Sequence, residues 1–181
     1  MTSTFRDPAK VLRDIIINEM GLTAQQVEVY NQKYDIPTVP GIYVAISFVS
    51  GRCIGAKSYV EDAGVDDHDV DLGLTEIQEV AMNELYQIDI MSADLTARAR
   101  KEELILAMTS IFAQQQCEKY QMNIASIPQN FMDASDVEGS ARLTRYTMTI
   151  AVNALYKKIK AAPYYDQYPS PEIWVDTKPE A

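Results

Sequence analysis

The sequence has very little of the material from which enzyme and metal sites are usually built. Among 181 residues there is one histidine, His68, so a histidine-dependent catalytic triad has a single choice of base. The two cysteines, Cys53 and Cys117, lie far apart with no histidine at zinc-ligand spacing, and we expect both thiols to be buried and reduced. No phosphate loop, dinucleotide fingerprint or nucleophile elbow is present. We therefore predict no catalytic residue, no metal and no cofactor.

Long apolar runs and positive charge are also scarce. No apolar run approaches the roughly 20 residues that a membrane span needs, and the first ten residues lack the apolar segment of a signal peptide. The sequence therefore predicts an intracellular protein with no membrane partner. Sixteen basic residues against 26 acidic ones leave a net charge of −10, which disfavours tight nucleic-acid binding. Lys157, Lys158 and Lys160 form the one basic cluster, and we expect a solvated strand end there.

The first third of the chain contains a helix signal and several strand signals. Asp7 before Pro8 predicts a helix start, and Gly21 predicts its end. The stretch around residues 26–30 fits either a second capped helix or a short strand, and its β-branched residues favour the strand. Alternation predicts a strand over residues 41–48. Ser50-Gly51 then predicts a turn, with residues 52–60 returning as the second strand of a hairpin.

The remaining two thirds alternate between long strands and helical spacing. Apolar and polar residues alternate over residues 76–91 and again over residues 142–156, which predicts two long strands. Residues 94–118 have helical spacing and residues 121–127 read as a short strand. The expected buried stripe of that helix consists of Leu95, Ile105, Met108, Ile111 and Phe112.

This order of elements predicts an α+β fold: a twisted, mainly antiparallel sheet with two helices on one face. We expect one domain over residues 1–162. Residues 163–181 then form a C-terminal arm rich in proline and tyrosine.

The sharpest chemical candidate is the acidic loop around Asp66 to Asp71. Its alternate aspartates, Asp67, Asp69 and Asp71, are typical of the start of a calcium loop, but the required glycine and glutamate positions hold Leu72 and Gln78. A solvated loop is the favoured interpretation. A calcium-binding or hydrolytic module that uses these acids, and a contact loop for a basic partner, are the alternatives.

The arm contains a second candidate site of a different kind. Tyr164, Tyr165, Tyr168 and Trp174 lie in a segment that cannot build its own core, and such side chains are the usual anchors of protein interfaces. The arm packs either on its own domain or on a neighbouring subunit.

Several segments carry a likeness to a known family. They are Val27–Gln32, Ile36-Pro37, Gly41–Val44, Glu76–Val80, Ile88–Ser92, Met108–Tyr120, Ile127-Pro128, Glu138–Leu143, Arg145-Tyr146 and Tyr164–Asp166. In these segments the chain resembles phage neck and tail-terminator proteins. The resemblance implies an antiparallel sheet flanked by helices, with no enzymatic site to carry over. It also implies a ring, commonly a hexamer, that caps the tail tube and joins it to the connector below the portal.

From this resemblance we expect a structural virion protein of the neck, assembled in the host cytoplasm. Its expected partners are further copies of itself, the tail tube protein, the head-to-tail connector and, as a further candidate, the sheath. DNA is expected to pass through the ring without specific binding. For contact with the adjoining ring we predict Asp66, Asp67, His68, Asp69 and Asp71, and for contact with the next subunit Tyr164, Tyr165, Tyr168 and Trp174. A tube, collar or baseplate subunit and a cytosolic adaptor unrelated to phage are the remaining alternatives.

Overall fold

The structure is a computed structural model, and it describes residues 6–30, 41–62, 74–127, 130–138 and 141–161. The helices over these ranges are α1 (Pro8–Met20), α2 (Thr96–Thr109) and α3 (Ile111–Lys119). The strands are β1 (Val27–Tyr30), β2 (Ile42–Asp62), β3 (Leu74–Ser92), β4 (Met122–Ser126), β5 (Met132–Asp133), β6 (Asp136–Glu138) and β7 (Ala141–Ala161).

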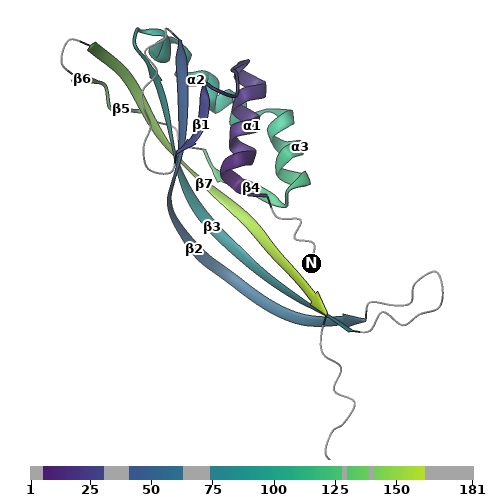
Figure 1. The fold of residues 1–181 in the computed structure, drawn as a ribbon. Helices are drawn as coiled ribbons and strands as arrows, with labels where there is room; N and C mark the ends of the chain where they lie inside the picture. Colours follow the sequence, from purple (N-terminus) through teal and green to yellow (C-terminus); the bar gives the residue numbers. More distant parts are fainter. Residues whose placement is uncertain (1–5, 31–40, 63–73, 128–129, 139–140, 162–181) are drawn as a thin grey trace, which may run out of the picture.

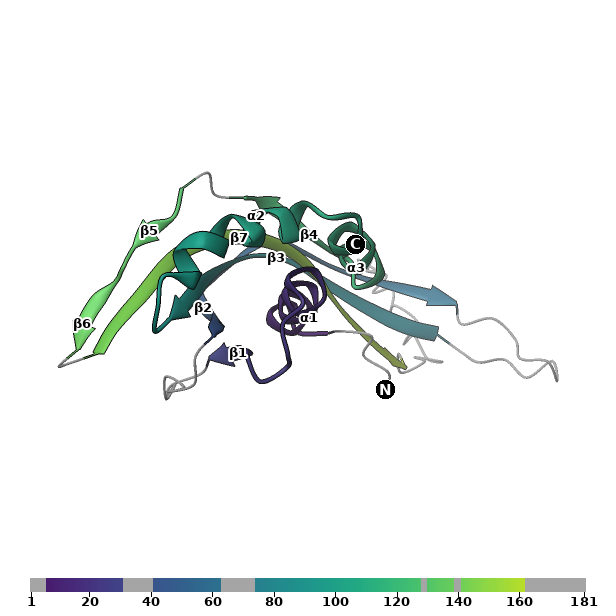
Figure 2. The same ribbon diagram turned by 90° about the horizontal axis from the view of Figure 1, so that it is seen from above.

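One sheet dominates the molecule. Its strand order is β1-β2-β3-β7-β4, and β5 and β6 also pair with β7. Only the β1–β2 pairing is parallel among the described strands, so the expected α+β class with a mainly antiparallel sheet is confirmed. The sheet curves around α1, and the long strands β2, β3 and β7 run on past the helices (Figures 1 and 2).

Helix α1 forms where the sequence predicts it. The Asp7 carboxylate accepts a hydrogen bond from the backbone N–H of Ala9 at 2.9 Å, and Pro8 occupies the first turn, where its missing N–H costs nothing. Gly21 ends the helix with φ at 64°, a left-handed conformation that suits glycine. The buried stripe that faces the sheet contains Val11, Leu12, Ile15 and Ile16.

The long strands contribute the other side of this core. Alternate residues of β3 and β7 are buried under the helices, as the sequence pattern predicts. The fully or almost fully buried side chains from the strands are Val44, Ile46, Ile88, Ile90, Met148, Ile150 and Val152. The short strand over residues 27–30, favoured over a helix, is also confirmed as β1.

The single helix expected over residues 94–118 is wrong, and so is the count of two helices. The helix is interrupted at Ser110, whose backbone is extended and whose hydroxyl accepts a hydrogen bond from the N–H of Ala113 at 3.0 Å. Serine competes with the helical ladder by bonding nearby backbone groups, so it ends α2 and caps α3. The break rotates the expected stripe, and Leu95 and Ile111 are 57% and 75% exposed. Met108 of the expected stripe is buried as predicted, and Ala97, Leu104 and Ala107 are buried with it.

The turn expected at Ser50-Gly51 is also wrong. β2 continues through it as one strand and stays paired with β3 from Ile42 to Asp62. Instead of a turn, the β2–β3 pairing has two shifts of register, one between Phe48 and Ser50 and one between Cys53 and Gly55. Such bulges bend a strand without ending it, which explains why the alternation breaks while the pairing persists.

Two smaller differences concern the region after β4 and the thiols. After β4, the sequence predicts no strand before residue 142, but the structure has β5 and β6 there, and both pair with β7. β7 itself runs to Ala161, past the expected end at Tyr156. Cys117 is buried as expected, but Cys53 is exposed; both are free.

Candidate assembly interface

The most unusual part of the molecule is the portion of the sheet that the helices do not cover. β1 pairs with β2 only from Val44 to Ser47, and β4 pairs with β7 no further than Ala154. Beyond those points, and apart from one hydrogen bond from the Leu155 N–H to the Gln121 carbonyl at 3.2 Å, β2, β3 and β7 pair only with one another within the described residues. We call this three-stranded part, residues 48–62, 74–85 and 155–161, the extension (Figure 1). Its outer edges belong to β2 and β7.

The β2 edge of the extension carries apolar side chains that the described structure leaves largely exposed, although the Phe48 ring lies edge-on to Tyr86 with ring centroids 5.8 Å apart. Phe48, Val49, Ile54 and Val60 are each more than half exposed, at 58%, 53%, 57% and 55%. Isolated exposed apolar residues are ordinary, but four on one unpaired strand edge are not. Unpaired edges with apolar side chains are sites for strand addition or association.

The middle of the extension is held by ion pairs that cross all three strands. Lys57, Glu79 and Lys157 occupy directly opposite positions on β2, β3 and β7. The Lys57 ammonium lies 2.8 Å and the Lys157 ammonium 3.7 Å from Glu79 carboxylate oxygens, and the Tyr59 hydroxyl donates to the same carboxylate at 3.1 Å. The hydrogen bond from Lys57 lowers the pKa of Glu79.

A second row of polar contacts lies nearer the end of the extension. Lys160 sits opposite Glu76 and is 2.9 Å from its carboxylate, which also accepts from Ser58 at 3.1 Å and Gln78 at 2.6 Å. The hydrogen bond from Lys160 lowers the pKa of Glu76. The basic cluster is therefore paired internally at Lys157 and Lys160, while Lys158 is exposed. This arrangement fits a reinforced sheet better than a phosphate-binding patch.

A buried carboxylate marks the root of the extension. Glu84 lies on the helix-facing side of β3 and is buried. The Tyr86 hydroxyl donates to Glu84 at 2.5 Å, and the Tyr156 hydroxyl donates to its other oxygen. Burial and the bond to Glu84 raise the pKa of both phenols, so both remain protonated donors at neutral pH.

The opposite face of the sheet has a second buried carboxylate. Asp89 is buried and accepts from Arg145 at 2.8 Å, from Thr147 at 2.5 Å and from Gln87 at 3.0 Å. The Nε atom of Arg145 is buried with no hydrogen-bond partner. These bonds tie Asp89 of β3 to the neighbouring strand β7.

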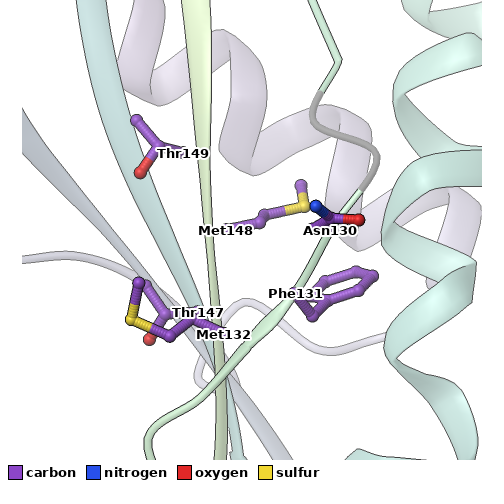
Figure 3. A pocket seen from close by; sticks show the side chains of 6 residues that line it. All are labelled: Asn130, Phe131, Met132, Thr147, Met148 and Thr149. Atoms are coloured by element: carbon purple, nitrogen blue, oxygen red, sulfur yellow. The ribbon is translucent and has the colours of Figure 1, made fainter.

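Two open hollows lie on the strands. One, of about 420 Å³, lies beside β7 where β4 and β5 pair with the same edge of that strand, and its lining contains no ionisable side chain (Figure 3). Its lining residues are Asn130, Phe131, Met132, Thr147, Met148 and Thr149. The other, of about 280 Å³, lies on the extension beside the second bulge of β2 and is lined by Gly55, Ala56, Lys57, Glu79, Ala81 and Leu155. Its only ionisable groups are the Lys57–Glu79 pair.

The predicted contact residues lie outside the described residues. This applies to Asp66, Asp67, His68, Asp69 and Asp71 and to Tyr164, Tyr165, Tyr168 and Trp174. Within the described ranges, no group of three or more histidine, cysteine or acidic side chains is placed to hold a metal ion. None of the helices there is long and apolar enough to cross a membrane.

Comparison with known proteins gives no relative: no protein-family model matches the chain, and no curated protein matches it significantly.

The sequence reasoning missed the extension itself. A weak signal was present, because apolar residues recur from Phe48 to Val60 with no proline or acidic residue among them. Ser50-Gly51 led to the prediction of a hairpin, because the same dipeptide occurs both in turns and at β-bulges.

Proposed function

We propose that this protein is a structural component of the phage neck, which caps the tail tube as a ring and joins it to the head-to-tail connector. The observation that carries the proposal is the extension: three strands held by internal ion pairs, with two open edges and an exposed apolar strip on β2. Such a surface is suited to binding protein, since a strand edge recognises another chain through its backbone groups.

The two open edges support closed assembly in particular. The β2 and β7 edges lie on opposite sides of β3 and run in the same direction, because each is antiparallel to β3. Edges of this kind allow a head-to-tail contact in which one edge of a copy meets the other edge of the next. Repeated head-to-tail contacts close into a ring when the rotation between copies closes.

The charge of the chain supports a role around DNA without binding to it. Six copies at −10 each would carry a net charge of about −60, which repels DNA and lets it slide. The likeness of the sequence segments to neck and tail-terminator proteins supports the site in the virion.

The test is to image purified particles with an antibody against this chain. The proposal predicts signal at the junction of capsid and tail. Signal at the distal tip or along the tube would refute the neck assignment and favour a tube or baseplate subunit. Absence from particles would favour the cytosolic adaptor.

A further inference from the structure

We infer that the exposed β2 edge, Phe48 to Val60, is the docking site for the C-terminal arm, residues 162–181, of a neighbouring copy. This inference rests on the proposed ring and names the contact that would close it. Three properties of the two segments support it: their charge, their length and register, and the position of their ends.

The charges of the two segments are complementary, although the chain as a whole is acidic. Residues 48–60 contain Arg52 and Lys57 and no acid. The arm contains four acids and a single lysine, Lys178. Its acids are Asp166, Glu172, Asp176 and Glu180. Lys57 is paired with Glu79, so Arg52 is the exposed charge on this edge that the acidic arm would meet, and opposite charges favour that contact.

The register of the sheet places the aromatic residues of the arm level, along the strand direction, with the apolar residues of the β2 edge. Ala161 and Glu61 both pair with Thr75, so the arm leaves β7 level with the end of the β2 edge. Counted back along β2 from this level, Tyr168 falls beside Ile54 and Trp174 beside Phe48, to within the roughly two residues that a tight turn consumes. The hollow of about 280 Å³ lies on the sheet face beside Gly55, between β2, β3 and β7, where an aromatic side chain of the arm would find space.

The arm is long enough, and its prolines suit an outermost position. Residues 48–60 span roughly 40 Å as a strand, and residues 162–181 reach at most about 66 Å when extended. Proline cannot donate to a central ladder but is tolerated at a sheet edge. Pro163, Pro169 and Pro171 therefore fit a segment that lies outside β2 and is paired on one side only.

The topology favours a neighbour over the arm's own chain. Within one copy, β3 separates the end of β7 from the β2 edge. In a head-to-tail ring the β7 side of one copy turns toward the β2 edge of the next, and the arm that continues β7 would lie on that edge between the two copies.

The native thiol of Cys53 provides the test, because it is exposed in the middle of the strip while Cys117 is buried. Full-length protein carrying Tyr168→Cys is oxidised mildly over a concentration series, and the products are resolved without reductant and mapped by mass spectrometry. We expect a bond between Cys53 and position 168 that joins different chains into dimers and a ladder of larger species. Thr149→Cys, an exposed position on β7 away from the strip, is the matched control and should give no bond to Cys53. A bond formed only within one chain, or none at any concentration, overturns the inference.

Charge reversal gives an independent readout. Arg52→Glu should lower the yield of the cross-link about two- to fivefold, and Glu172→Lys in the same chain should restore it. Arg98→Glu, an exposed arginine on α2, is the control and should leave the yield unchanged.

Deleting residues 163–181 should weaken ring formation and leave Cys53 open to alkylation at all concentrations. If the deleted chain still forms rings at the capsid–tail junction, the arm contact fails while the proposed function stands. If the cross-link forms but the antibody signal is elsewhere, the proposed function fails and the self-contact stands.

Discussion

The buried carboxylate at the root of the extension gives the sharpest test of how this fold is held together. Glu84 accepts from both Tyr86 and Tyr156, and it lies where the core under the helices ends and the extension begins. Glu84→Ala removes the acceptor from both phenols at once. The two tyrosines then differ in what they can do, because Tyr86 is only 3% exposed while Tyr156 is half-buried and can reach water.

The size of the effect follows from this difference. An orphaned buried hydroxyl at Tyr86 costs about 1–3 kcal/mol, and a hydrogen bond exchanged for water at Tyr156 costs about 0.5–1.5 kcal/mol. Glu84→Ala should therefore lower the free energy of unfolding by about 2–4 kcal/mol. For a chain of this length a loss of about 3 kcal/mol lowers Tm by roughly 6–12 °C. Urea unfolding followed by circular dichroism measures the free energy directly. Glu76→Ala, on the same strand and face but less buried, should cost measurably less.

A double-mutant cycle decides whether the network is the cause. Tyr86→Phe removes the hydroxyl that Glu84→Ala would leave orphaned, so the double variant should be less destabilised than the two single losses together, by about 1–2 kcal/mol. Additivity to within about 0.5 kcal/mol would show that the two residues do not act through their hydrogen bond, and the reasoning would fail.

Three further predictions follow from burial and charge. Ile15→Ala, at a fully buried position of α1, should lower the free energy of unfolding by about 2–5 kcal/mol, whereas Leu106→Ala, at a 67% exposed position of α2, should change it by less than about 0.5 kcal/mol. The pKa of Glu79 is lowered in the folded chain, so its contribution to the free energy of unfolding is present above its ordinary pKa of 4.5 and is lost as pH falls through the lower folded value. The difference in stability between wild type and Glu79→Gln should therefore shrink below pH 4.5. A difference that grows there would contradict this. In the dissociated folded chain, Ellman's reagent should react with Cys53 at once and with Cys117 only on unfolding. Cys117 is buried, and this burial also raises the pKa of its thiol. Rapid reaction of both thiols would contradict the packing of α3.

The elements that the sequence predicted well are those whose local signals agree with their burial. The α1 helix has a side-chain cap, a proline in its first turn, a glycine end and a single apolar face, and all four coincide in the structure. Strands β3 and β7 alternate because one face lies under the helices. The local sequence pattern and the tertiary environment then favour the same structure, so the pattern alone is enough to predict these elements.

The errors occur where the local signal is ambiguous. Helical spacing runs through Ser110 without interruption, yet its side-chain cap is what ends α2 and begins α3. In the same way Ser50-Gly51 satisfies the rule for a hairpin, but β3 is long enough to keep pairing with β2 on both sides of the dipeptide. The extent of a partner strand is not encoded near the turn residues, which is why a local rule cannot find it.

The same reasoning explains why the candidate interface could not be derived from a motif. Each stabilising device in the extension, such as the Lys57–Glu79–Lys157 row, joins residues that are far apart in sequence and become neighbours only through register. Those devices stiffen the three strands from within, yet none of them covers Phe48, Val49, Ile54 or Val60. A sheet that needed the extension only for its own stability would gain more by burying these four side chains than by pairing surface charges, because exposed ion pairs contribute little. A rigid, internally paired strip with an uncovered apolar edge is therefore better explained as a surface kept in shape for another chain to bind.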